Sequence, residues 1–552
     1  MATRKNRIRS AISLVNSKLS VKMAAIVLAS STLISALLGI FRDRWLNTMY
    51  LDTYPAGLDA YTAAFTVPDF LFFIITSGAL AVTFVPVFNQ HLVSGDKKSA
   101  WQLSASTLNF LAVVSFVASI FIMIFADPLV RYVVAPGLNE SAMSLAINMM
   151  RVIAINPLLF SISTVTASMQ QAVGRFIFYA AAPALYNIGI IIGIRCFTNG
   201  INIFGFQLFE GGIMGVALGV VLGALLQLFT SIVGLIGLGF DYEFKINWKN
   251  KGFRQVLRML PSRSADQSID YIMSIINTNL ASRMGEQSIR AFQQANSLHS
   301  MPVNLVGVAI ANAFFPKMSE EIGRKDEKAF RETFCSALRT IICISMPISI
   351  ITFFSRGYVV NFIKNGGNPK IASVLGAFIV AIMCQSVFHI ASRGFYAKQN
   401  TKTPLIISII AFAIQLVCAF GLSAAGFGPE GLAYATSIST LSEVGMLLIA
   451  QHRDMDGQLF DRKFWSSIIR VGFASGVAGI VSWILTKLLP LLATDNSFFA
   501  TFPKFCVIAG GSLLVYVILC YILRVEEIRP IVQKFTSYLF RNITEQQSKK
   551  KK

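Results

Sequence analysis

Long apolar runs separated by short polar breaks fill the chain from residue 23 to residue 524. A helix needs about 20 apolar residues to cross the hydrocarbon of a bilayer, and fourteen runs are candidates for such spans. The pattern therefore predicts an all-α polytopic membrane protein with about fourteen transmembrane helices. The predicted centres lie near residues 32, 78, 115, 156, 185, 225, 271, 305, 343, 382, 413, 440, 476 and 512.

Composition supports this interpretation of the pattern. Of the 552 residues, 54% are hydrophobic and 14% are charged, about half the charged fraction of a soluble protein. Such a composition excludes a disordered chain, a disulfide scaffold, a coiled coil and a secreted enzyme. The seven cysteines form no CxxC pair and the four histidines are spread along the chain. We therefore expect packed cysteines and no metal site.

The basic residues predict the orientation. The net charge is +21, and the side of the membrane that holds the N-terminus carries about three times as many Lys and Arg residues as the other side. This bias places both termini in the cytoplasm by the positive-inside rule. The first apolar run, residues 23–41, is long and lacks a convincing cleavage site, so we expect it to be retained as a span. The basic ends are expected to face anionic lipid headgroups, and no nucleic acid is expected as a partner.

Two pairs of stretches echo each other within the chain. The stretch from Pro183 to Gly219 resembles that from Pro404 to Ala435, because each has a proline-led span followed by a span that opens with Gly-x-x-Gly-x-Ala. The stretch from Pro68 to Pro86 echoes that from Pro302 to Pro316 in the same order. Parallel repeats of this kind are typical of transporters, although glycine and alanine also recur in any helix bundle.

The repeats suggest a division of the chain into two six-helix lobes and two additional helices. The expected parts are a basic cytoplasmic N-terminus (1–22), an N-lobe (23–240), a cytoplasmic linker (241–258), a C-lobe (259–452), two C-terminal spans (464–524) and a basic cytoplasmic tail (525–552).

Charged residues in or beside apolar runs are candidates for a transport site. Asp59, Arg263, Asp266 and Asp270 lie within runs, and Arg42 directly follows the first run. An ionised group at mid-bilayer costs about 3 kcal/mol, so it normally faces a partner or a water-filled cavity. The spacing of Arg263, Asp266 and Asp270 places them on one stripe of a helix. The stripe either contacts a substrate or forms a local ion pair.

Neutral polar residues are also unusually frequent in spans 7 and 8. Six such side chains favour a wetted groove over simple contacts between helices: Asn277, Asn279, Gln293, Gln294, Asn296 and His299. For His299 alone, a hydrogen-bonded core histidine is favoured over a binding role. The chain has no Walker loop, GxSxG motif or HExxH motif, so we expect a transporter and not an enzyme.

Several blocks, in order across spans 1 to 12, resemble a known family. The blocks are Gly39–Arg44, Leu58–Phe70, Gly78–Leu80, Phe84–Phe88, Ala182–Gly189, Asn304–Ala311, Arg393–Ala397 and Thr401–Pro404. They are similar to the MurJ (MviN) lipid II flippase family of the multidrug/oligosaccharidyl-lipid/polysaccharide exporter superfamily. The resemblance implies movement of undecaprenyl-pyrophosphate-linked disaccharide-pentapeptide to the outer leaflet, by alternating access of two lobes around a cationic cavity. It also implies that residues 464–524 help to form a groove for the lipid tail.

The resemblance suggests roles for individual residues. Arg42 matches a cavity arginine of the family, and Asp59 matches a functionally required aspartate. Positions where other members carry further cavity arginines hold neutral residues here: Ala36, Phe72, Phe73, Asn296 and Ser297. A pyrophosphate pocket would then draw charge from elsewhere, and Arg263 is the candidate. The predicted substrate-binding residues are Arg42, Asp59, Arg263, Asp266, Asp270, Asn296 and His299.

These expectations define a bacterial inner-membrane lipid flippase that acts as a monomer. Its expected partners are lipid II, membrane lipids and the peptidoglycan synthesis machinery. No cofactor is expected, and the membrane potential or an ion gradient would drive transport. Three alternatives stay open: a flippase for another polyprenyl-linked oligosaccharide, a cation-coupled drug exporter and a non-transporting scaffold. The sequence does not identify the coupling ion or the headgroup specificity.

Overall fold

The computed structural model describes residues 20–528, except residues 78, 204, 205, 456, 458 and 493. Within that range, the side chains of residues 21–22, 77–82, 201–208 and 260–268 lie outside the description. The basic segments predicted at the two ends therefore fall largely outside the described residues.

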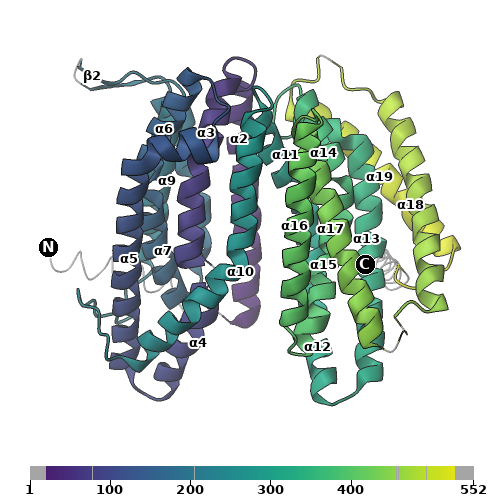
Figure 1. Ribbon diagram of the computed structural model, residues 1–552, viewed down its shortest axis with the longest axis horizontal. Helices are drawn as coiled ribbons and strands as arrows, with labels where there is room; N and C mark the ends of the chain where they lie inside the picture. Colours follow the sequence, from purple (N-terminus) through teal and green to yellow (C-terminus); the bar gives the residue numbers. More distant parts are fainter. Residues whose placement is uncertain are drawn as a thin grey trace, which may run out of the picture. The chain divides into compact units, whose positions relative to one another are not determined.

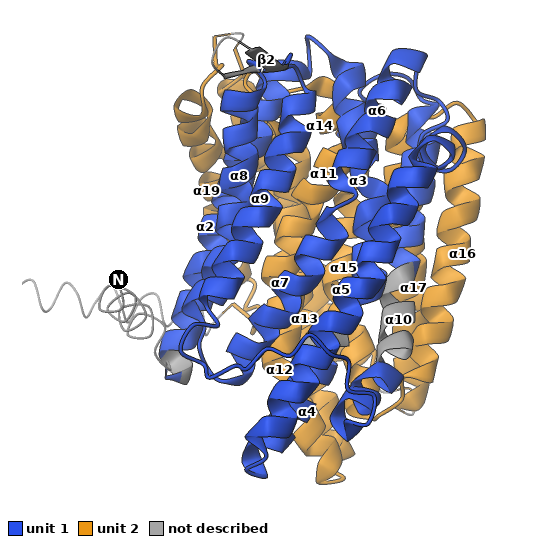
Figure 2. Ribbon diagram, turned by 90° about the vertical axis from the view of Figure 1, so that its left-hand side faces the viewer, with its two compact units in different colours: residues 1–290 blue, residues 291–552 orange. Residues whose placement is uncertain are grey.

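Backbone contacts divide the chain into two compact units, residues 1–290 and residues 291–552 (Figure 2). The elements of unit 1 are α2 (Val21–Tyr50), α3 (Pro55–Phe72), η1 (Phe73–Ser77), α4 (Ala79–Val93), α5 (Lys97–Pro128), η2 (Leu129–Val134), α6 (Glu140–Ile153), α7 (Asn156–Ala172), α8 (Ile177–Ile192), η3 (Gly193–Phe197), β1 (Ile201–Ile203), β2 (Phe206–Phe209), α9 (Met214–Val233) and α10 (Lys251–Ser282). Helix α11 (Ser288–Pro302) begins at the end of this unit, and unit 2 continues with η4 (Val303–Val308), α12 (Ala309–Gly323), α13 (Glu327–Asn361), α14 (Pro369–Ala377), α15 (Ile379–Ala397), α16 (Lys402–Ala424), α17 (Pro429–Asp454), α18 (Arg462–Leu488) and α19 (Phe498–Ile522) (Figure 1).

The predicted all-α class is confirmed, with one short addition. Strands β1 and β2 form an antiparallel hairpin between η3 and α9, in which Ile203 pairs with Phe206. The η elements are π-helical turns. Several helices begin at a side chain that accepts a hydrogen bond from a first-turn N–H, which satisfies a donor that the helix itself cannot. These capping residues are Asp96, Asn139, Asn250, Asp326, Asp461 and Ser497.

The helices are long enough to cross a membrane, as the apolar runs predict. Among the described residues, 12 helical segments have the length and hydropathy of a span, and the bent pair α14 and α15 brings the number to 13. The predicted span near residue 271 corresponds to α10, which has 32 residues but carries charges and amides through its length. Its polarity explains why this count is one below the predicted fourteen.

Matching features in the two units support the predicted repeat. In unit 1 the π-helical turn η1 interrupts the run from α3 to α4, and in unit 2 η4 interrupts the run from α11 to α12. Helix α8 packs against α9, as α16 packs against α17. Helix α10, however, packs on α4, η1 and α3, so the division between units follows it at Arg290. The lobe boundaries at 240 and 259 stay a prediction.

Each unit has its own apolar core. In unit 1, Phe84 and Phe88 of α4 are fully buried and pack with Leu103, Met169 and Phe253. The unit 2 core includes the following buried residues of α12, α13 and α15: Met318, Phe330, Phe334, Ile341 and Ile390. Helices α18 and α19 pack against each other and against α13. The lipid-tail groove predicted for residues 464–524 stays a prediction.

Glycines allow α8 and α9 to approach at backbone distance (Figure 2). A Cβ added at Gly219 would lie 2.5 Å from the Cα of Gly193, and one added at Gly189 would lie 2.3 Å from the Cα of Gly223. Small residues at membrane helix interfaces permit this close packing, which supplies dispersion contacts that lipid cannot replace. In the Gly-x-x-Gly-x-Ala pattern singled out in the sequence, a Cβ added at Gly215 would lie 2.5 Å from the carbonyl carbon of Phe197, so this glycine also lies at a close backbone contact.

We predict that Gly219→Leu destabilises the protein by about 1–3 kcal/mol, because the new side chain would push α8 and α9 apart. The matched control is Gly421→Leu in α16, where an added Cβ meets no atom within 4 Å. Thermal unfolding in detergent should show a lower midpoint for Gly219→Leu and an unchanged midpoint for the control. Equal midpoints for the two variants would contradict the packing account.

Candidate functional site

Arg42 of α2 is held by contacts on two sides. Its Nη2 lies 3.2 Å from Oδ1 of Asp43, and its Nη1 donates to Oδ1 of Asn187 at 3.0 Å. The Asn187 side chain, on α8, is itself positioned because its Nδ2 donates to the carbonyl oxygen and the hydroxyl of Ser35. Helix α8 therefore fixes the direction in which the Arg42 guanidinium extends from α2.

Arg290, the last residue of unit 1, lies in the first turn of α11 and also contacts the carboxylate of Asp43. Its Nη2 lies 3.2 Å from Oδ1 of Asp43, and its Nε donates to Oδ1 of Asn47 at 2.9 Å. Its side chain is only 3% exposed. A guanidinium buried this deeply needs hydrogen-bond partners and a counter-ion, and the α2 residues supply both.

Asp59 of α3 contacts the backbone of the same residue. Its Oδ1 accepts a hydrogen bond of 2.8 Å from the backbone N–H of Arg290, and Asp59 is 2% exposed. The N–H groups of a first helical turn lack partners within the helix and carry partial positive charge. Asp59 thus acts as an acceptor for the start of α11. The predicted contact between Asp59 and a substrate stays a prediction.

We refer to Arg42, Asp43, Asn47, Asp59, Asn187 and Arg290 as the Arg42–Arg290 cluster. Its two arginines and two aspartates balance in formal charge, and one carboxylate oxygen, Asp43 Oδ1, serves both guanidinium groups. The two arginines differ in solvent access, because the Arg42 side chain is 25% exposed and the Arg290 side chain is 3% exposed. Arg42 is therefore the more accessible of the two arginines, while the buried Arg290 anchors Asp43.

The other charged candidates are not brought into this cluster by described contacts. Asp270 is an exposed residue of α10, and Asn296 is an exposed residue of α11. The side chains of Arg263 and Asp266 lie outside the described residues, so the charged stripe stays a prediction. Among the residues that the structure describes, no group of three metal-ligating side chains is found.

His299 is buried in unit 2 with partners for both ring nitrogens. Its Nε2 lies 2.9 Å from Oε1 of Gln385, and its Nδ1 lies 2.8 Å from the carbonyl oxygen of Asn296. The ring also stacks on Phe378, with centroids 4.5 Å apart. These contacts favour the hydrogen-bonded core histidine over the substrate-binding role, for which the geometry offers no support.

Sequence reasoning missed Arg290, Asn47 and Asn187 as parts of the site. A signal was present for two of them. Arg290 is a charged residue at the start of the polar stretch that contains Gln293 and Gln294, and Asn47 lies four residues after Asp43, on the same face of a helix. Asn187 gave no comparable signal, because a lone asparagine in a span usually contacts a neighbouring helix.

A family model described as "Lipid II flippase MurJ" matches residues 55–502. The chain belongs to the MurJ lipid II flippase family. This confirms the resemblance drawn from the sequence blocks, and the matched range includes the Asp59 and Arg290 positions of the cluster. Arg42 precedes the matched range.

Named relatives of the family match over most of the chain. A "Probable lipid II flippase MurJ" of Buchnera aphidicola is 26% identical over 420 residues, which is 74% of this chain and 79% of the relative. One of Thermotoga maritima is 23% identical over 519 residues, or 91% of this chain and 97% of the relative. A "Lipid II flippase MurJ" of Burkholderia cenocepacia is 26% identical over 70% of this chain and 75% of its own length.

Solved structures show the same fold at low identity. The chain matches "Lipid II flippase MurJ, inward closed conformation" with a TM-score of 0.73 and 21% identity, covering 91% of this chain and 100% of that one. It matches an inward-facing multidrug resistance MATE transporter of the MOP superfamily with a TM-score of 0.63 and 16% identity, covering 79% of this chain and 99% of that one. Both likenesses show that the chain shares the all-helical fold of these two solved structures.

For Asp59 we predict a graded loss of stability. Asp59→Ala removes the acceptor for the Arg290 N–H and should cost about 1–3 kcal/mol. Asp59→Asn keeps an oxygen acceptor and loses only the charge beside the helix start, for about 0.3–1 kcal/mol. Thermal unfolding in detergent measures both, with Asp127→Ala on α5, an aspartate whose side chain is 48% exposed, as the control. Equal losses of stability in Asp59→Ala and Asp59→Asn would show that the hydrogen bond from the Arg290 N–H to Asp59 is not the important contact.

Proposed function

We propose that this protein flips lipid II, the undecaprenyl-pyrophosphate-linked disaccharide-pentapeptide, from the cytoplasmic to the outer leaflet. The observation that carries the proposal is the family match over residues 55–502. The Arg42–Arg290 cluster supplies the chemistry that the substrate requires. A pyrophosphate headgroup carries at least two negative charges and cannot cross hydrocarbon unaided, so its carrier needs a polar site with cations.

Arg42 is the proposed contact to the pyrophosphate. Arginine presents donors in a fork that matches two phosphate oxygens, which lysine cannot reproduce. In the structure this fork contacts Asp43 and Asn187, and both contacts are exchangeable because Arg42 is partly exposed. When a phosphate replaces Asp43 as the ionic partner of Arg42, Asp43 stays paired with Arg290. The exchange of partners therefore leaves no carboxylate unpaired.

Other parts of the proposal rest on the sequence. Arg263 is proposed to add positive charge along α10 on the substrate path, where Asp266 and Asp270 hold it in place or exchange with the phosphate. The membrane potential is the proposed driver, because moving one charge through 100 mV is worth about 2.3 kcal/mol, and no cofactor is needed. We propose that the protein works as a monomer in contact with membrane lipids and with the enzymes that make and use lipid II.

The cytoplasmic membrane is the proposed location, with both termini in the cytoplasm. The support is the excess of Lys and Arg on one side of the spans. In this orientation the turn between α4 and α5, the segment 241–258 and the turn between α12 and α13 face the cytoplasm.

The transport proposal predicts that Arg42→Ala abolishes flipping while the protein still accumulates in the membrane. Arg42→Lys should also fail, because an ammonium group does not make the two-oxygen contact. The control is Arg324→Ala, since that side chain is 73% exposed in a surface ion pair with Glu320. The measurement is lipid II exposed on the outer leaflet of cells whose own flippase has been depleted. Normal transport by Arg42→Lys would disprove bidentate phosphate recognition at this residue.

The orientation predicts a labelling pattern. Single cysteines placed at Lys98, Lys249 and Lys328, in a protein without its native cysteines, should resist a membrane-impermeant reagent added to intact cells. All three should react after the cells are opened. Strong labelling of any one of them in intact cells would contradict the proposed orientation.

A further inference from the structure

The segment between α9 and α10 lies along α5 in unit 1 and is pinned there by hydrogen bonds. The Tyr242 hydroxyl donates to Oδ1 of Asn109 at 2.6 Å, and Asn109 Nδ2 donates to the carbonyl oxygen of Lys245 at 3.1 Å. The backbone N–H of Asn247 donates to the hydroxyl of Ser106 at 2.9 Å. Residues 242–250, which we call the α5 strap, therefore have a fixed path across this helix.

An apolar groove lies on one side of the α5 strap. It has a volume of about 590 Å³ and is lined by α5, by α7 and by the strap itself. Val113 and Phe116 of α5 are 54% and 52% exposed, and Phe244 of the strap is 88% exposed. Among the residues that the structure describes, Lys245 is the one cationic residue that lines the groove. The groove therefore combines mostly apolar walls with the positive charge of Lys245.

Aromatic residues around the strap indicate its depth in the membrane. Trp101 packs on Phe240, with ring centroids 5.4 Å apart, and Trp248 packs on Phe110 and Phe253. Trp248 is 56% exposed. Tryptophan and tyrosine gather where headgroups meet hydrocarbon, so we expect the strap to lie near that level. The groove extends from the strap along the apolar part of α5, roughly 15 Å or more from the helix start at Lys97.

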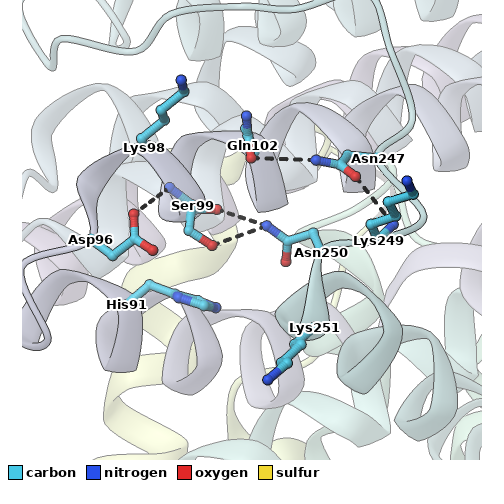
Figure 3. Close-up of a pocket in the computed structure, with 9 residues that line it drawn as sticks. All are labelled: His91, Asp96, Lys98, Ser99, Gln102, Asn247, Lys249, Asn250 and Lys251. Atoms are coloured by element: carbon cyan, nitrogen blue, oxygen red, sulfur yellow. Dashed lines mark hydrogen bonds between the residues drawn. The ribbon is translucent and has the colours of Figure 1, made fainter.

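A second, basic pocket lies at the other end of the strap (Figure 3). It has a volume of about 440 Å³, and Lys98, Lys249 and Lys251 stand around it as exposed residues. At its centre, Asn250 Nδ2 donates hydrogen bonds to the carbonyl oxygen and the hydroxyl of Ser99 (Figure 3). The lysines extend away from this centre, so they create a positive field at the surface and not a closed anion cage.

We propose that the α5 strap binds an anionic phospholipid of the leaflet in which it lies. One acyl chain occupies the groove, and the phosphate pairs with Lys245 in the field of Lys98, Lys249 and Lys251. Charge complementarity favours this occupant, because each lysine near a membrane surface adds about 1 kcal/mol of attraction to anionic lipid. The apolar walls favour a molecule that carries a chain over a soluble anion. This site is independent of lipid II flipping and of the Arg42–Arg290 cluster.

Native mass spectrometry of the full-length protein, taken from detergent with equal phosphatidylglycerol and phosphatidylcholine, tests the proposal. Two variants change the site: Ala112→Phe fills the groove, and Lys245→Ser removes the charge. The matched controls are Val117→Phe, at a residue of α5 that does not line the groove, and Lys328→Ser, at an exposed lysine of α13. Thermal unfolding in lipid-free detergent confirms that each variant is folded.

The expected result is preferential retention of phosphatidylglycerol by the wild-type protein and both controls. Lys245→Ser should lower that retention about fivefold, which corresponds to about 1 kcal/mol. Ala112→Phe should lower retention of both phospholipids, because its ring occupies the position of the chain. Since Lys245 is on the surface, its variant tests the site even if Ala112→Phe fails to fold.

Four results would overturn the proposal. The first is unchanged retention in Lys245→Ser. The second is an equal loss in Val117→Phe, which would indicate nonspecific lipid around the helices. The third is stabilisation by inorganic phosphate alone that equals stabilisation by phosphatidylglycerol, which would indicate a soluble anion. The fourth is replacement of bound phosphatidylglycerol by undecaprenyl phosphate at equal concentration, which would assign the groove to polyprenyl lipid.

Discussion

The carboxylate of Asp43 is the contact on which the candidate site depends. One oxygen of this group lies 3.2 Å from a guanidinium nitrogen of Arg42 and 3.2 Å from one of Arg290. Arg290 is buried, and a buried cation without a counter-ion would destabilise the fold strongly. This requirement ties the start of α11 to α2, and Asp59 ties the same turn to α3. The start of α11 at Arg290 is thereby fixed to the consecutive helices α2 and α3, from which it is far away in sequence.

The balanced charge of the cluster suits a carrier that alternates between empty and loaded states. A site with unpaired arginines would be costly to expose to hydrocarbon when empty, whereas Arg42 and Arg290 are compensated by Asp43 in this structure. In the exchange proposed above, a pyrophosphate that pairs with Arg42 replaces one anionic partner with another. The exchange therefore changes which groups are paired without leaving a buried charge alone. The partial exposure of Arg42 and the burial of Arg290 give these two arginines different parts in that exchange.

The sequence predicts the local features well, because their causes are local. Apolar runs reveal the spans, and the Gly-x-x-Gly-x-Ala pattern includes Gly215, which lies at a close contact with the backbone of Phe197. The π-helical turns follow Pro68 and Pro302 in the two units, in line with the predicted repeat. Arg290 was missed because its partner Asp43 lies 247 positions away, and nothing in the local pattern connects them. For His299, the contact with Gln385 favours the core histidine, and only the tertiary structure provides this contact.

The central claim is that the negative charge of the pyrophosphate is what the site recognises during transport. The most direct test compares two fluorescent substrates in liposomes that contain the wild-type protein: lipid II, and an analogue whose pyrophosphate is replaced by a neutral linker. The account predicts that lipid II crosses the bilayer faster than in protein-free liposomes and that the neutral analogue does not. Equal acceleration of both substrates would contradict it, because a site built from Arg42, Asp43 and Arg290 has no means of recognising the uncharged compound.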